Sequence, residues 1–401
     1  MNELDEKLLR INCNIACLLK DRANMLNQYD KISINCSTLI ASEEVNAMLA
    51  QKGASINAAN AYVCDVQGDI IEIASGTVLD GNANYENRFL VSNGDLVLRE
   101  TGAEALEKST GMVVTGTLYY PASLPVSALA KVRGAKKSYP AGMYPLIGSL
   151  ALESLIKQIP SDQTRVWVSG KVSALDEKVL LEAEKAGLKI ACGSLFTYEG
   201  LDSRYGGMFD TESQTLVPDG FEIIKNSNLS PEIVALYGTK LYIQGNVTLE
   251  ERDASCLDEL EEVIIKGCAS LPSSLVAPFR RIGKADSYFI YEGCLRKING
   301  SEQITHEELH QAVASGIKYT LNINGHLSFS DDVMPDDIEA ISAIYINGAV
   351  IVPAAAKAAL STRVKKCNGY LGSSSKTVEH LTQKIIAGDF SNINTNTYFL
   401  V

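Results

Sequence analysis

The segment His306-Glu307-Glu308-Leu309-His310 has the residue types and the spacing of a zinc site. Residues four apart lie on the same face of a helix, so the two imidazoles could bind one zinc ion. Glu307 would then be the general base of a hydrolase. A third ligand has to come from elsewhere in the chain, and the candidates are His326, Asp331 and Glu339.

The same segment also fits an ordinary surface helix. Thr305 followed by Glu308 is a capping-box pattern, which predicts that the helix begins at His306 and leaves this residue at an exposed end. Glu308 places a charge where zinc proteases generally have an uncharged residue, and Val313 stands where the longer metzincin pattern has glycine. The sequence therefore favours the surface helix, with a zinc-dependent hydrolase as the alternative.

A second segment, Gly372-Ser-Ser-Ser-Lys376-Thr377, resembles a phosphate-binding loop. The Walker pattern requires glycine at positions 370 and 375, where this chain has Tyr370 and Ser375. Helix capping by serine explains the run as well. We therefore expect no nucleotide and no other cofactor.

Composition narrows the class of protein. The chain has 401 residues, 46% hydrophobic and 21% charged, with a net charge of −12. This balance is typical of a globular protein and argues against a general binder of nucleic acid or anionic membranes, since phosphate contacts need an excess of lysine and arginine. The nine cysteines are scattered without a C-x-x-C pair, and the acidic N-terminus MNELDEKLLR does not resemble a signal peptide, so we expect a cytoplasmic location.

Glycines reveal a repeat. They form pairs about 22 residues apart, a spacing within the range of repeat proteins, and a third glycine precedes each pair. The sets are Gly76/Gly94/Gly116, Gly148/Gly170/Gly193, Gly220/Gly245/Gly267 and Gly300/Gly325/Gly348. Equivalent glycines of successive sets lie about 75 residues apart, which makes a second, longer period. Apolar residues two and four positions to either side of the glycine alternate with other residues, which indicates a strand with one buried face.

One strand and one short helix in about 22 residues cannot bury their own apolar face, which is the physical reason for solenoids. The coil length and the order of strand and helix resemble leucine-rich repeats, although the leucine motif itself is absent. This resemblance implies an α/β repeat solenoid of stacked parallel strands with short helices or turns, and a right-handed parallel β-helix is the alternative. We expect residues 30–371 to form a single solenoid of about four 75-residue super-repeats.

The two ends are expected to close that solenoid. Apolar residues at heptad-like spacing predict an N-terminal helical cap over residues 1–29. Residues 372–401 are expected to form a C-terminal cap helix, over 375–388, followed by a tail. The apolar tip of the tail, Tyr398–Val401, is predicted to pack on the cap, or else to add to a sheet edge.

Two sets of side chains could form an interaction surface. Trp167, Tyr242 and Tyr345 lie three residues before a repeat glycine, on the strand face opposite the predicted core, so they are either exposed aromatics or core residues of a covered face. Basic residues recur past the third glycine and would stack along one edge of a solenoid, unless they only neutralise helix C-termini; they include Arg133, Lys137, Arg280, Arg281, Lys365 and Lys366.

The sequence thus favours a non-enzymatic cytoplasmic repeat scaffold for protein–protein interaction or self-assembly. Its partner would be another protein or a second copy, not nucleic acid or a membrane. A zinc-dependent hydrolase using His306 and His310 is one alternative, and polyanion or carbohydrate binding is the other.

Overall fold

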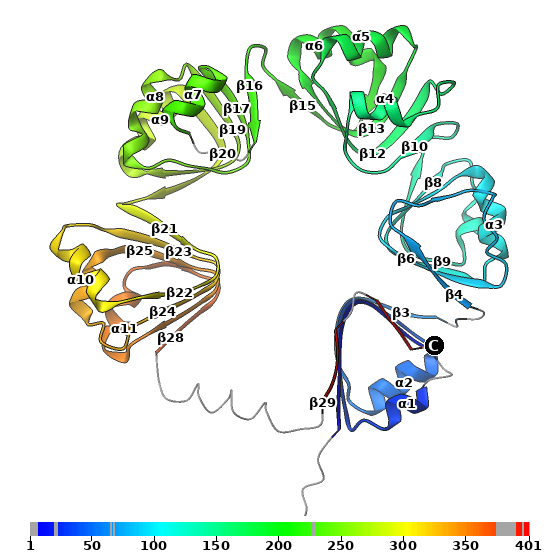
Figure 1. Ribbon diagram of the computed structural model, residues 1–401, viewed down its shortest axis with the longest axis horizontal. Helices are drawn as coiled ribbons and strands as arrows, with labels where there is room; N and C mark the ends of the chain where they lie inside the picture. Colours follow the sequence, from blue (N-terminus) through cyan, green and yellow to red (C-terminus); the bar gives the residue numbers. More distant parts are fainter. Residues whose placement is uncertain are drawn as a thin grey trace, which may run out of the picture. The chain divides into compact units, whose positions relative to one another are not determined.

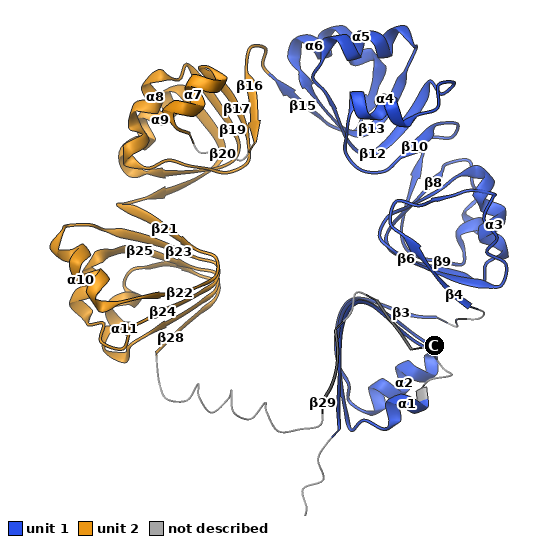
Figure 2. Cartoon of the chain, viewed as in Figure 1, with its two compact units in different colours: residues 1–217, 385–401 blue, residues 218–384 orange. Residues whose placement is uncertain are grey.

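The computed structural model describes residues 7–19, 23–64, 66, 69–225, 229–373, 390–394 and 397–400. The strands in these segments pair in parallel and form six separate sheets (Figure 1). The sheets belong to five groups of bent strands with helices between them, which we call modules 1 to 5. Modules 1 to 3 lie in one compact unit, residues 1–217 and 385–401, and modules 4 and 5 lie in the other, residues 218–384 (Figure 2).

Module 1 consists of β1 (Leu8–Leu18), α1 (Ala23–Asn27), β2 (Lys31–Ala41), α2 (Glu43–Gln51), β3 (Ser55–Val63), β29 (Phe390–Asn394) and β30 (Thr397–Leu400). Module 2 consists of β4 (Asp69–Ala74), β5 (Val78–Leu79), β6 (Arg88–Asn93), β7 (Leu96–Leu98), η2 (Glu100–Gly102), α3 (Ala103–Lys108), β8 (Gly111–Pro121), η3 (Val126–Leu129) and β9 (Val132–Tyr139). Module 3 consists of β10 (Tyr144–Leu146), β11 (Leu150–Ala151), α4 (Leu152–Gln158), β12 (Arg165–Ala174), α5 (Glu177–Lys185), β13 (Lys189–Tyr198), α6 (Glu199–Tyr205), η4 (Gly206–Met208), β14 (Phe209–Thr211) and β15 (Gln214–Val217).

Module 4 consists of β16 (Glu222–Lys225), α7 (Pro231–Tyr237), β17 (Lys240–Gln244), β18 (Val247–Thr248), η5 (Glu251–Asp253), α8 (Ala254–Glu259), β19 (Glu262–Pro272), η6 (Ser273–Leu275), α9 (Val276–Ile282) and β20 (Gly283–Tyr291). Module 5 consists of β21 (Cys294–Ile298), β22 (Ser301–Ile304), α10 (His306–Ala314), β23 (Tyr319–Ile323), β24 (His326–Phe329), η7 (Pro335–Ala340), β25 (Ile341–Ile346), β26 (Ala349–Val352), α11 (Ala354–Ser361), β27 (Val364–Cys367) and β28 (Tyr370–Ser373).

The shorter glycine spacing is the register of neighbouring strands within a module. In module 4, Leu241 of β17 pairs with Val263 of β19, its equivalent in the next coil. In module 5, His326 of β24 pairs in the same way with Ala349 of β26. Equivalent residues of neighbouring strands are therefore paired side by side, and the glycines at the bends follow the same spacing.

The prediction of one continuous solenoid is wrong, and the alternative of a single parallel β-helix is wrong for the same reason. In the described residues no sheet runs on from one module into the next. Each module instead has its own cluster of buried apolar side chains under its helices, and two smaller clusters connect module 1 to module 2 and module 2 to module 3. The longer period of the glycine sets marks the start of a new sheet, because the chain begins another module instead of adding a strand to the previous one.

The N-terminal segment is a strand and not the expected helical cap. Leu8–Leu18 form β1, and Leu9, Ile11 and Ile15 are buried with at most 2% of their surface exposed. Leu9 and Ile11 are two residues apart and belong to the same buried cluster, which is the period of a strand, and the pairing of this segment with β2 excludes a helix here. The short helix α1 follows this strand.

The C-terminal tail completes module 1. Strands β29 and β30 both pair with β1, so the tail adds to a sheet edge of its own chain. The predicted cap helix over residues 375–388 lies outside the described residues. None of the described helices is long and apolar enough to span a lipid bilayer.

Candidate functional sites

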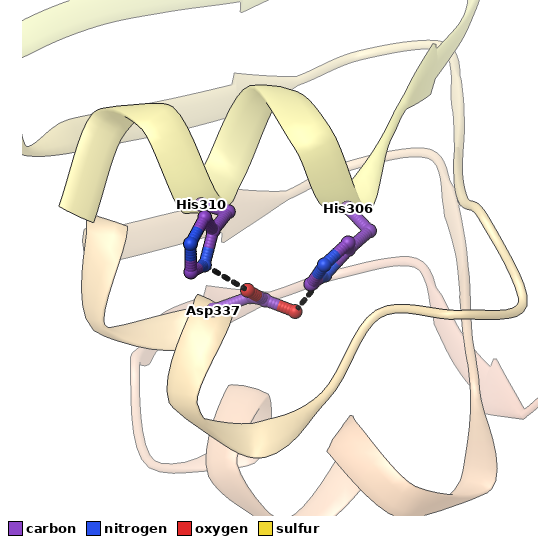
Figure 3. A group of neighbouring side chains, drawn as sticks. All are labelled: His306, His310 and Asp337. Carbon is purple, nitrogen blue, oxygen red and sulfur yellow. Dashed lines mark hydrogen bonds and ion pairs between the residues drawn. The ribbon is translucent and has the colours of Figure 1, made fainter. Parts of the chain in front are cut away.

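Helix α10 holds the two histidines of the zinc-like segment on one side of its first turns (Figure 3). Thr305 caps the helix by accepting a hydrogen bond from the backbone N–H of Glu308 at 3.3 Å, so the helix begins at His306 as expected. Leu309 and Ala312 are buried against the core of module 5. This anchoring leaves the side chain of His306 39% exposed and that of His310 71% exposed.

The carboxylate of Asp337 reaches both histidines from the neighbouring coil. Asp337 lies in η7, and its side chain is 4% exposed. Its Oδ2 is 2.7 Å from Nδ1 of His306 and accepts the backbone N–H of Met334 at 2.8 Å. Its Oδ1 is 3.9 Å from Nδ1 of His310, which is too long for a hydrogen bond. One ligand atom from each of the three residues lies within 4.8 Å of the others.

Electrostatics in this group favour a positive charge next to Asp337. The hydrogen bond to Asp337 raises the pKa of His306 above its ordinary value, against the opposing effect of desolvation. The two histidine rings lie 5.5 Å apart between centroids, so each can turn toward the same carboxylate. The site thus has two imidazoles and one nearly buried carboxylate that share a small volume.

Two of the three proposed hydrolase residues come together, and the third does not. Glu307 is exposed, and its Oε1 accepts a hydrogen bond from Nε2 of Gln311 at 3.3 Å, outside the group formed by His306, His310 and Asp337. Glu308 forms an ion pair with Arg296, which also binds Glu302. The group therefore contains ligands for a cation, but not the general base that the hydrolase alternative assigns to Glu307.

The residue that lies beside both histidines is Asp337, and not one of the candidates His326, Asp331 and Glu339. In the sequence, Pro335-Asp-Asp is typical of the acidic start of a helix and does not single out Asp337 as a ligand. Asp337 does cap η7, but its carboxylate also faces α10. The repeat spacing could have identified Asp337, because η7 occupies the coil after α10 and the two elements lie side by side.

The aromatic residues of the expected interaction surface belong mainly to packed regions. Trp167 is 6% exposed and lies between the rings of Tyr119 and Tyr139, at 5.2 and 5.3 Å between centroids. Tyr242 is 1% exposed. Both are therefore core residues, which is the second of the two alternatives for these positions. Tyr345 is half-buried and packs edge to face with Phe289 at 4.8 Å.

The basic residues lie on three elements that belong to different modules. Arg133 and Lys137 are on β9, Arg280 and Arg281 end α9, and Lys365 and Lys366 are on β27. Strands β9 and β27 belong to separate sheets, so these residues do not form a stripe within one sheet. Lys137 pairs with Glu212 at 3.1 Å. The position of Arg280 and Arg281 in the last turn of α9 is the one that the helix dipole favours.

Strand β3 is an open edge that sequence reasoning missed. It pairs with β2 and, among the described strands, with no other. Its residues, SINAANAYV, include no charged side chain, and Ile56 and Val63 are 41% and 48% exposed. Two other last strands, β9 and β27, carry lysines, which hinder pairing with another chain, and the uncharged last strand β28 has only 4 residues. Only the outcome of strand pairing could have identified β3 as an edge.

Comparison with known proteins finds no match for this chain among protein-family models, curated proteins or solved structures.

Proposed function

We propose that the chain is a non-enzymatic binding scaffold that captures an extended segment of a protein partner by strand addition to β3. The observation that supports this proposal is an exposed edge strand of 9 residues without a charged side chain. An open edge presents a row of backbone N–H and C=O groups to a partner strand, and the alternating side chains give specificity.

The rest of module 1 makes this edge suitable for docking. Strands β1 and β2 beside it are long and well buried, and residues such as Ile34 and Leu39 of β2 fix the sheet to the core. A partner strand would therefore add to a rigid template, which reduces the entropy lost on binding. The exposed side chains of Ile56 and Val63 would contribute apolar contacts.

We place this activity in the cytoplasm. The nine cysteines are free thiols, and this usage is typical of a reducing compartment. A protein partner is preferred over a polyanion because the basic residues are divided among β9, α9 and β27, which belong to three different modules.

The test compares two double variants of the full chain. In Ala59→Lys/Ala61→Lys, both lysines lie on exposed positions of β3; in the control, Ala47→Lys/Ala50→Lys, both lie on exposed positions of α2. Peptides are selected from a displayed library against the wild-type chain, and their dissociation constants are measured for each variant. We expect at least about tenfold weaker binding to the β3 variant, since two added charges oppose edge pairing, and unchanged binding to the α2 variant.

Equal binding to both variants, or a selection that yields no peptide, would contradict the proposal. The same proteins also test pairing of β3 with a second copy. In that case the wild-type mass in solution rises to that of a dimer with concentration, and the β3 variant stays monomeric.

A further inference from the structure

We propose that His306, His310 and Asp337 form a binding site for one divalent transition-metal ion of the zinc class, and that this ion connects α10 to η7. The inference is independent of strand addition at β3 and involves no hydrolysis. Asp337 would be the third ligand beside the two histidines. Because the histidines lie on α10 and Asp337 lies on η7, the ion would join two successive coils of module 5.

The donor set selects the metal class. Neutral imidazole nitrogens suit zinc, copper and nickel, and a single carboxylate is compatible with each of them. Magnesium and calcium prefer sites composed of oxygen ligands, which this group does not provide. Zinc is therefore an appropriate probe, with three protein ligands and water in the fourth position.

The distances require only small side-chain movements. Zinc–ligand bonds of about 2.0–2.1 Å in a tetrahedron place the ligand atoms about 3.3 Å apart. His306 Nδ1 and Asp337 Oδ2 are 2.7 Å apart, and His310 Nδ1 and Asp337 Oδ1 are 3.9 Å apart. These two distances end on different oxygens of Asp337, whereas the site needs one ligand atom from each residue. Such a set of three atoms exists with no separation above 4.8 Å, so the longest separation has to shorten by at most about 1.5 Å to reach the tetrahedral spacing. The two partly exposed imidazole rings can rotate by this amount.

Burial of the carboxylate supplies the driving force. The Asp337 side chain is 4% exposed, and a carboxylate removed from water needs hydrogen bonds or a cation. The backbone N–H of Met334 binds Oδ2 and orients the group, as the outer partners of metal ligands do. A divalent ion at the position between the two rings would take the place of the proton that His306 and Asp337 share and would also engage His310.

Neighbouring acidic groups are already committed elsewhere. Glu308 pairs with Arg296, and Glu307 accepts a hydrogen bond from Gln311. Asp332 accepts a hydrogen bond from the Ser330 hydroxyl at 2.5 Å, and that hydroxyl in turn accepts the backbone N–H of His306 at 3.0 Å. These contacts fix the start of α10 and leave Asp337 as the carboxylate that faces both histidines.

The experiment measures zinc binding by titration calorimetry at about pH 7.5, where most imidazoles are neutral, with the full chain under reducing conditions. The chain has four histidines, which provides a matched control: His306→Ala/His310→Ala removes the two in the site, and His326→Ala/His380→Ala removes the other two. Asp337→Asn and His310→Ala are tested singly, since an asparagine oxygen can still accept the Met334 N–H and His310 is highly exposed. Circular dichroism checks that each variant is folded without metal.

We expect one zinc ion per wild-type chain and unchanged binding to His326→Ala/His380→Ala. We expect at least about thirtyfold weaker binding to Asp337→Asn, to His310→Ala and to the variant without both site histidines. Cobalt(II) bound to the wild-type chain should show visible d–d bands without a sulfur charge-transfer band. Absence of stoichiometric zinc, full binding to Asp337→Asn, or a cobalt spectrum with cysteine ligation would overturn the proposal.

Discussion

Some glycine positions in module 5 have no room for even a methyl group, because the neighbouring strands approach closely there. The Cβ of an alanine at Gly348 would overlap the carbonyl oxygen of Gly325, and an alanine at Gly325 would overlap that of Gly300. At Gly300 a Cβ would have no heavy atom within 4 Å. The glycines inside the stack are thus required by close backbone approach, whereas the first one is not.

Gly348→Ala and Gly300→Ala make this difference measurable. We expect Gly348→Ala to destabilise module 5 by about 2 kcal/mol or more, because the clash is with backbone and cannot be relieved by rotating a side chain. Hydrogen exchange in β25 and β26, read by mass spectrometry, should accelerate by about thirtyfold. Gly300→Ala should exchange like the wild type, and similar acceleration in both variants would refute the argument.

At the scale of residues, the sequence predicts only part of the group formed by His306, His310 and Asp337. His306 and His310 were identifiable from a spacing of four residues, because helix geometry places them on one face. Asp337 lies in the following coil, far from both histidines along the chain, and its acidic neighbour Asp336 has an equally plausible sequence context. Only the packing of η7 beside α10 distinguishes the two carboxylates.

At the scale of elements, strand pairing determines the fold where sequence periodicity is ambiguous. The shorter glycine spacing predicts the register within a module, because each coil has nearly the same length. It does not tell whether a new strand joins the previous sheet or starts another. That choice depends on which strand edges are covered, and it is seen only in the division of the strands into six sheets.

Strand β1 provides a test of edge covering. Deletion of residues 390–401 removes β29 and β30 and leaves β1 with β2 as its one remaining partner among the described strands. We expect faster hydrogen exchange across Leu8–Leu18 and a greater tendency to aggregate, because an uncovered edge of 11 residues pairs readily with other chains.

A synthetic peptide of residues 390–401 supplies the control for this deletion. Added in excess, it should bind in place of the missing strands and restore slow exchange in β1. Exchange that is equally slow with and without residues 390–401 would show that these strands do not cover β1.

At the scale of the whole molecule, the division into two compact units predicts unfolding in more than one step. Small domains with a single core unfold cooperatively, whereas chains with several cores generally do not. Trp167, the one tryptophan in the sequence, is packed between Tyr119 and Tyr139 in the unit of modules 1 to 3. Its fluorescence therefore reports on that unit alone.

Urea unfolding followed by two probes tests this expectation. Tryptophan fluorescence follows the first unit, and far-ultraviolet circular dichroism follows the helices and strands of both. We expect transition midpoints that differ between the probes. A single coincident transition would mean that the two units unfold together.

The position of β29 and β30 in the sheet of module 1 has a consequence for biosynthesis. Strand β1 is translated before modules 2 to 5, and its neighbours Phe390–Asn394 and Thr397–Leu400 are translated about 380 residues later. At about 5–20 residues per second, module 1 waits on the order of 20 to 80 seconds for its last two strands while modules 2 to 5 emerge. Module 1 is therefore begun before the other modules and completed after them, and during translation β1 is the edge that a chaperone would have to shield.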